Sequence, residues 1–196
     1  MSFSQPSLIR RASCRVALMG FTLFGCFAFS AAFSAQTPSG RDVVKAAVYS
    51  SLDPASRGSS FQIAVVMKIR PEFHVNAREK SEEYLIATDL KADLPAGFSG
   101  GEVIYPKGKL QKFLFSKTPL NVYEGAVTLR LPVTALANAP VGAQKIPLKL
   151  RYQACSREIC LPPVTLNLEA LLNILASPSG AKPAHEDIFG ETVALP

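Results

Sequence analysis

Short runs of alternating apolar and polar residues recur along the chain, and this pattern restricts the fold more than any other feature. The clearest run is FQIAVVMKI at 61–69, in which every second residue from Phe61 to Ile69 is apolar. Such alternation is typical of a β-strand with one buried face. Further strand-like runs, separated by residues that favour turns, lie at 42–53, 72–77, 82–95, 100–106, 121–133, 143–155 and 164–172.

The number of these segments, with turn signals between them, favours an all-β fold built as an antiparallel β-sandwich. The stretch with the best helical character, EALLNIL at 169–175, is short. The roughly 140 residues of 36–175 can bury a sizeable core, so the domain need not depend on a disulfide to fold. The Pro-, Ser- and Gly-rich end, residues 176–196, predicts a flexible tail.

The start of the chain has the organisation of a secretory leader. Arginines without any acidic residue precede the apolar run VALMGFTLFGCFAF, which leads into the small-residue stretch SAAFSA. That run is too short and too early to favour a membrane anchor. We therefore expect residues 1–35 to be a signal peptide and the protein to be periplasmic or otherwise exported. In a second interpretation, LFGC at 23–26 is a lipoprotein cleavage site and Cys26 carries a lipid anchor.

Loss of the leader changes how charge and cysteine content are interpreted. The formal net charge falls from +6 to about +3, because the leader holds three arginines and no acid. This weakens the case for nucleic-acid binding. Cys14 and Cys26 are lost with the leader, and His74 and His185 are the only histidines. These residues are too few for a structural zinc site, and we expect neither a metal nor a cofactor.

The remaining two cysteines lie in RYQACSREICLPP at 151–163. If SREI forms a four-residue hairpin loop, Cys155 and Cys160 are opposed across two antiparallel strands, with Cα atoms about 4.5–5.5 Å apart. Such a disulfide would close only a short loop and contribute about 2 kcal/mol to stability. Pro162 and Pro163 indicate an edge or a bulge, where a partner sulfur has access. Spacing alone leaves both a redox role and a local structural role open.

The stretch YQACSREICLPPVT at 152–165 resembles the cysteine motif of the N-terminal periplasmic domain of the thiol:disulfide interchange protein DsbD. In that family a Tyr-Gln pair precedes the first cysteine and a Pro-Pro pair follows the second. The segment at 105–133 is similar to the loop and strand ahead of that motif, and the resemblance covers roughly residues 60–168. It implies an immunoglobulin-like β-sandwich with a redox cysteine hairpin at one edge.

The resemblance also implies roles for particular residues. Cys155 and Cys160 would be the redox pair, and the second cysteine would form the mixed disulfide. A cap loop would lie around LQKFLFSK at 110–117, with Phe113 or Phe115 as the ring that shields the pair. From periodicity alone, the same two rings could equally face the core.

The implied function is periplasmic thiol–disulfide interchange, as a component of a protein-disulfide reductase. Electrons would come in trans from a thioredoxin-like or membrane-embedded thiol–disulfide donor and pass to periplasmic disulfide proteins. The alternative is a non-catalytic immunoglobulin-like binding or assembly module, in which the disulfide only rigidifies a hairpin. The sequence does not identify donor or acceptor, the direction of electron flow, or the oligomeric state.

The chain departs from the family pattern near the cysteines. Gln111 and Lys112 stand where better-known members have acidic residues, and His74 and Asn76 stand where they have tyrosines facing the pair. His74 is either an auxiliary group that assists proton transfer or a partly exposed surface residue. Tyr152 is either auxiliary or part of the core.

Overall fold

The computed structural model describes residues 38–190 of the chain, and the regular secondary structure of these residues is almost entirely β-strand. The predicted signal peptide and the alternative lipid site at Cys26 lie outside the described residues. The short helical segments within the described part are α1 (Gly40–Val43), the 3₁₀ turn η1 (Pro178–Gly180) and α2 (Glu186–Phe189). The all-β fold expected from the alternating runs is confirmed.

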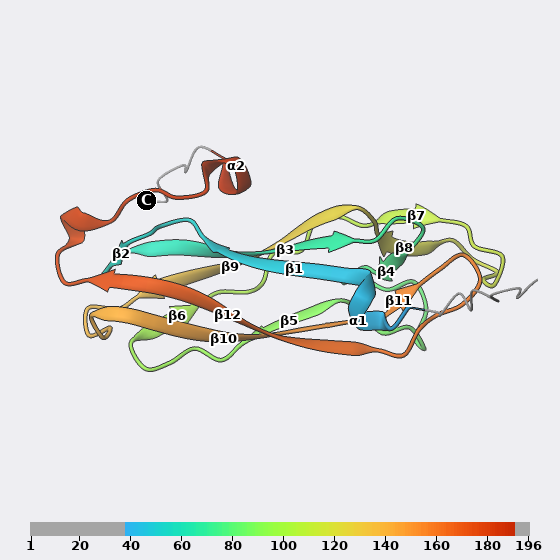
Figure 1. The fold of residues 1–196 in the computed structure, drawn as a ribbon, viewed down its shortest axis with the longest axis horizontal. Helices are drawn as coiled ribbons and strands as arrows, with labels where there is room; N and C mark the ends of the chain where they lie inside the picture. Colours follow the sequence, from blue (N-terminus) through green and yellow to red (C-terminus); the bar gives the residue numbers. More distant parts are fainter. Residues whose placement is uncertain (1–37, 191–196) are drawn as a thin grey trace, which may run out of the picture. The chain divides into compact units, whose positions relative to one another are not determined.

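Two four-stranded sheets form the layers of the sandwich, and Figure 1 shows one lying over the other. The first sheet has the order β1 (Val44–Ser50), β3 (Ser60–Ile69), β9 (Ala126–Ala135), β6 (Phe98–Gly100). The second has the order β2 (Ala55–Ser56), β12 (Val164–Leu175), β10 (Gly142–Tyr152), β5 (Asp89–Ala92). All pairs are antiparallel except that of β2 with β12.

The core lies between these layers and is built from every second residue of the long strands. In β3 the predicted inward residues from Phe61 to Ile69 are all buried. The opposite layer contributes Ile146, Leu148 and Leu150 from β10, and Ala170, Leu172 and Ile174 from β12. Burying these side chains is the main favourable term for the fold, at roughly 1.5–3 kcal/mol for each large aliphatic side chain.

A third, smaller sheet lies at the right-hand end of Figure 1. Its order is β11 (Ala154–Cys155), β4 (His74–Asn76), β8 (Leu120–Tyr123), β7 (Lys109–Gln111), with antiparallel pairing throughout. Two segments that the sequence predicts as single strands therefore divide between sheets. The run at 121–133 becomes β8 and β9, because Gly125 adopts a φ of 66° between them. The run at 143–155 becomes β10 and β11, with Gln153 between them.

Three further expectations differ from the structure. The segment at 169–175 is part of β12 rather than a helix, because burial alternates between Leu171, which is exposed, and its buried neighbours on either side. Of the run at 82–95 only β5 is a strand. Of the run at 100–106, Gly100 ends β6 and Ile104 forms a single bridge with Arg130.

The segment after β12 contacts the outer face of the sandwich. Pro183 bridges to Leu52, the ring of His185 packs edge-on against Tyr49, and the Nη2 of Arg130 donates a 2.7 Å hydrogen bond to the carbonyl of Ile188. The flexibility predicted for residues 176–196 stays a prediction. Over residues 38–190, no helix is long and apolar enough to cross a membrane.

Candidate functional site: a disulfide on an edge hairpin

Cys155 and Cys160 form a disulfide across the mouth of a tight hairpin. The two residues are bridged as antiparallel partners, as the spacing predicts, and flanking hydrogen bonds join Ser156 to Ile159 and Leu161 to Ala154. The hairpin turn is closed by the Ser156 hydroxyl, which accepts hydrogen bonds from the amides of Glu158 and Ile159. The flanking hydrogen bonds make Cys155 and Cys160 a non-hydrogen-bonded pair, and their Cα atoms are 3.9 Å apart, closer than expected.

The two sulfur-bearing residues differ in access to solvent. Cys155 ends β11 and is fully buried. Cys160 lies on the outer arm of the hairpin, is exposed, and pairs only with Cys155. Because β11 is the edge strand of the third sheet, the hairpin has no strand beyond it. Of the two cysteines, Cys160 is therefore the more accessible to a thiolate from another molecule.

His74 is the cross-strand partner of Cys155. Its side chain is only 1% exposed, so the expectation of a partly exposed surface histidine is wrong. The alternation around His74 predicts one solvent-facing side, but β4 lies between β11 and β8 and is buried on both faces. The covering residues come from a distant segment of the chain, which local periodicity does not reveal.

That covering segment is the predicted cap loop at 110–117. The ring of Phe113 stacks on the imidazole of His74 with centroids 4.1 Å apart, and the ring of Phe115 stacks on Phe113 at 5.4 Å. Phe113 also packs on a small cluster of Leu85, Leu120 and Val122. Gln111 fixes the start of the loop through a 2.6 Å hydrogen bond from its amide to the carboxylate of Glu124.

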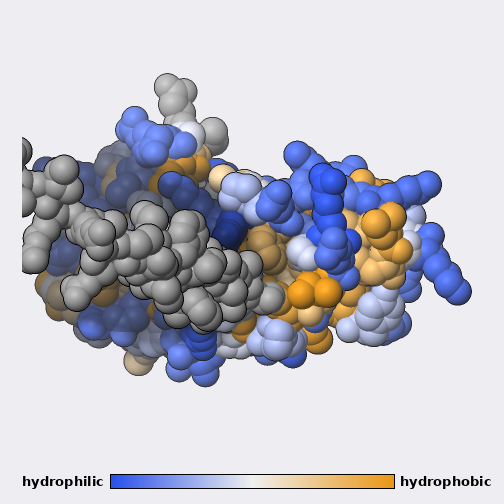
Figure 2. All heavy atoms as spheres, turned by 45° about the vertical axis from the view of Figure 1, so that its right-hand side comes forward, coloured by the Kyte–Doolittle hydropathy of each residue, from blue (hydrophilic) through white to orange (hydrophobic). Residues whose placement is uncertain are grey.

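The cap loop and the cysteine hairpin border a common groove. Its walls are formed by Gln111, Lys112, Phe113 and Leu114 from the loop and by Arg157 from the hairpin turn. Figure 2 shows apolar side chains gathered on the right-hand end of the molecule. The exposed large apolar side chains of these two segments are Leu110, Leu114, Phe115 and Ile159. Exposed apolar side chains next to a reactive group are typical of a surface that contacts another protein.

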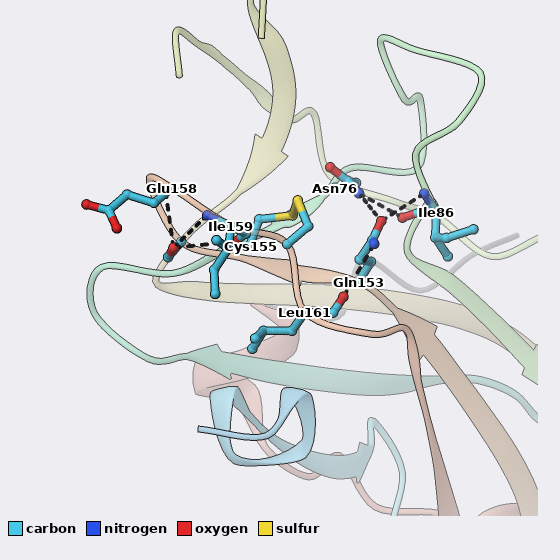
Figure 3. Close-up of a disulfide and its surroundings, with 9 residues drawn as sticks. Asn76, Ile86, Gln153, Cys155, Glu158, Ile159 and Leu161 are labelled. Carbon is cyan, nitrogen blue, oxygen red and sulfur yellow. Dashed lines mark hydrogen bonds between the residues drawn. A yellow bond between two sulfur atoms is a disulfide. The ribbon is translucent and has the colours of Figure 1, made fainter. Parts of the chain in front are cut away.

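The side chain of Gln153 joins the hairpin to neighbouring segments by hydrogen bonds, as Figure 3 shows. Its Oε1 accepts hydrogen bonds from the backbone amide of Ile86 (3.3 Å) and the side-chain amide of Asn76 (3.4 Å), and its Nε2 donates to the carbonyl of Leu161 (3.3 Å). The side chain therefore links both arms of the hairpin to β4 and the following loop. Gln153 is absent from the predicted site residues, although its position two residues before Cys155 places it on the same face of the chain.

Asn76 and Tyr152 take different positions. Asn76 is fully buried beside Gln153, and its Nδ2 also donates to the carbonyl of Ile86 at 3.1 Å. Tyr152 lies in the main core, where its hydroxyl donates a 2.9 Å hydrogen bond to the carbonyl of Gly40. Burial raises the pKa of Tyr152 to about 12, so the hydroxyl stays protonated as a structural donor.

Burial also controls the charge of His74. Loss of solvation lowers the pKa of His74 to about 4, and the nearby carboxylate of Glu124 opposes this shift only in part. The imidazole is therefore neutral at pH 7. Nothing among residues 38–190 groups three or more His, Cys, Asp or Glu side chains in a way that could hold a metal ion.

Fold and site together define a β-sandwich domain with a disulfide on an exposed edge hairpin, an arrangement suited to thiol–disulfide interchange. Residues 43–171 match the family described as the N-terminal domain of the thiol:disulfide interchange protein DsbD. The chain belongs to this family, and the resemblance carried by the cysteine motif is confirmed.

The solved structures that are similar to this chain include two domains of this type. The reduced DsbD N-terminal domain of Neisseria meningitidis is 20% identical, with a TM-score of 0.43, covering 76% of this chain and 95% of that one. The N-terminal periplasmic domain of ScsB from Proteus mirabilis is 16% identical, with a TM-score of 0.46, covering 68% and 49%. AggA, a fimbrial major subunit from Escherichia coli, is 7% identical, with a TM-score of 0.32, covering 71% and 99%. No curated protein matches the chain.

The burial of His74 predicts a pH-dependent stability. Between its unfolded value of 6.5 and its folded pKa of about 4, the unfolded chain binds a proton that the folded protein excludes. The free energy of unfolding therefore falls as the pH drops from about 6.5 to about 4, by on the order of 3 kcal/mol from this residue. Urea denaturation at pH 7 and pH 4.5 measures this loss, and His74→Phe should lose markedly less. Equal losses in the two proteins would show that His74 is not held neutral by burial.

Proposed function

We propose that this protein exchanges thiols and disulfides with other proteins through the Cys155–Cys160 pair. The observation that carries the proposal is the unequal access of the two cysteines, since Cys160 is exposed on an edge arm while Cys155 is buried. A disulfide that only stabilises a fold joins distant segments more effectively than this five-residue separation does. Membership of the interchange family supports the same conclusion.

The exchange is a nucleophilic displacement between sulfur atoms. A partner thiolate attacks the sulfur of Cys160, a new disulfide forms between them, and the bond to Cys155 breaks. The electron pair leaves with Cys155, which becomes a thiolate, while the partner sulfur is oxidised. A second partner thiol then attacks the mixed disulfide, which releases the partner as a disulfide and leaves both cysteines of this chain reduced. No cofactor takes part in these steps.

The cap loop controls access to the pair. Phe113 lies on His74, the neighbour of Cys155, and the loop shares a groove with the hairpin turn. A partner that docks at this end would displace the loop and occupy the apolar surface around it. In the absence of a partner, the closed loop slows reduction by small thiols.

The protein would act outside the cytoplasm, after removal of the leader at residues 1–35. Its electron donor is a thioredoxin-like or membrane-embedded thiol–disulfide protein acting in trans, and its acceptors are disulfide proteins in the periplasm. The chain would then be one component of a protein-disulfide reductase. The predicted leader and the family match support this assignment.

Trapping of mixed disulfides tests the proposal directly. The variants Cys155→Ala and Cys160→Ala are each mixed with a thioredoxin that keeps only one of its active-site cysteines. That cysteine is first joined to a small aromatic thiol in a mixed disulfide. Cys155→Ala leaves the exposed thiol and lacks the resolving cysteine, so it should accumulate a covalent complex. Cys160→Ala leaves only a buried thiol and should react about tenfold more slowly or less. Non-reducing electrophoresis and mass spectrometry measure both rates.

The double variant Cys155→Ser/Cys160→Ser is the control for non-covalent association in this experiment. Faster trapping by Cys160→Ala would reverse the assignment of the attacked cysteine. Failure of both single variants to form a complex would contradict the exchange function and favour the alternative, a binding or assembly module that needs neither thiol.

The cap predicts a second result. Replacing Phe113 by Ala removes the ring that covers His74, so reduction of the disulfide by dithiothreitol should become several-fold faster. Leu114→Ala is the matched control, because Leu114 is the next residue of the same loop and is 97% exposed. Rates from stopped-flow mixing that are equal for Phe113→Ala, Leu114→Ala and the unchanged protein would show that the loop does not shield the pair.

A further inference from the structure

Two buried polar atoms beside the cysteine hairpin have no hydrogen-bond partner among the described residues. They are the Nε2 of His74 and the Oδ1 of Asn76. Burial of an unpaired polar atom is unfavourable, and folded proteins rarely tolerate it without a functional reason. Both residues belong to β4 and are two positions apart, so their side chains lie on the same face of the strand.

The Asn76 amide is already held in place. Its Nδ2 donates to the carbonyl of Ile86 and to Oε1 of Gln153, both of which are acceptors, and this fixes the orientation of the amide. Figure 3 shows its oxygen pointing away from these two partners. The contacts of the His74 ring are aromatic, with Phe113 stacked on it, and its Nε2 has no hydrogen-bond partner among the described residues. Its free nitrogen is therefore the atom that is available for a new bond.

The neighbour of His74 changes chemically during exchange. Cys155 is its cross-strand partner, and partner residues of antiparallel strands project to the same face with Cβ atoms about 4.5–5.5 Å apart. In the disulfide, the sulfur of Cys155 carries no charge and no proton. Once the disulfide opens, the same buried sulfur becomes a thiolate that needs a donor, because Cys155 is fully excluded from water.

We propose that the Nε2–H of His74 donates a hydrogen bond to the sulfur of Cys155 when the disulfide opens, and so stabilises the leaving thiolate. This inference rests on the proposed exchange function and deepens it. The Nε2 of His74, which has no hydrogen-bond partner among the described residues of the oxidised protein, gains the sulfur of Cys155 as its acceptor in the reduced protein. No proton is transferred in this step: the partner sulfur bonds to Cys160, the electron pair stays on Cys155, and the imidazole remains neutral.

The surroundings of His74 suit this role. A neutral imidazole has one N–H to donate, and a hydrogen bond to an anion is about twice as strong as one between neutral groups. Burial under the cap keeps the pKa of His74 low, so the ring is neutral at pH 7. Glu124 is the charged group that acts on the ring through space. Lys112 on the cap loop, and Arg157 and Glu158 on the hairpin turn, are exposed.

The test compares His74→Phe with His185→Phe in the full chain. The first variant keeps an aromatic ring against Phe113 and removes both nitrogens, while the second makes the same change at the exposed histidine on the segment after β12. The pKa of the Cys155 thiol in the reduced protein is measured from the pH dependence of its Cβ chemical shift. In His74→Phe we expect a higher pKa, with the thiolate fraction at pH 7 lower by about tenfold. Reduction by dithiothreitol should slow accordingly, because a less stable thiolate leaves more slowly.

An unchanged pKa of the Cys155 thiol in His74→Phe would overturn the inference. Should that variant fail to fold, nitrogen NMR of the His74 ring in the unchanged protein decides the question. The Nε2 signal should shift between the oxidised and reduced states, and identical signals would contradict the hydrogen bond. These measurements need no protein partner. If these measurements show no hydrogen bond from His74, while Cys155→Ala still traps thioredoxin, the role proposed for His74 is wrong and the exchange function stands.

Discussion

The pairing of β11 with β4 is the contact on which the rest of the site depends. It places Cys155 opposite His74 and Ala154 opposite Val75, and so fixes the inner arm of the hairpin against a buried strand. Gln153 then ties the outer arm to the same strand through Leu161 and Asn76. These hydrogen bonds join both arms of the hairpin to the neighbouring strand independently of the sulfur–sulfur bond.

Burial distinguishes the two cysteines of the disulfide. Cys155 is fully buried at the end of β11, opposite His74 of β4, whereas Cys160 is exposed on the outer arm of the hairpin. A third sheet at the end of the sandwich produces this difference, since it carries the hairpin beyond the two layers that form the main core. The main core stabilises the fold, and the end sheet positions the disulfide.

Much of this arrangement follows from local patterns in the sequence. Period-two burial in β3, β9, β10 and β12 predicts the sandwich, and a four-residue loop between cysteines predicts their opposition. Two features do not follow. The break at Gly125 depends on one backbone angle inside an otherwise regular run, and the burial of His74 depends on Phe113, which is 39 positions away. Contacts of that range are set by the assembled sheets rather than by periodicity.

If the Cys155–Cys160 disulfide exchanges with thiols of other proteins, its reduction potential must lie in the range of exchange-competent disulfides. The purified protein is equilibrated with glutathione and dithiothreitol buffers, and its free thiols are then counted. A potential in the range of roughly −120 to −270 mV, where known exchange proteins lie, is the predicted result. A potential below about −300 mV is typical of structural disulfides, and it would contradict the exchange function.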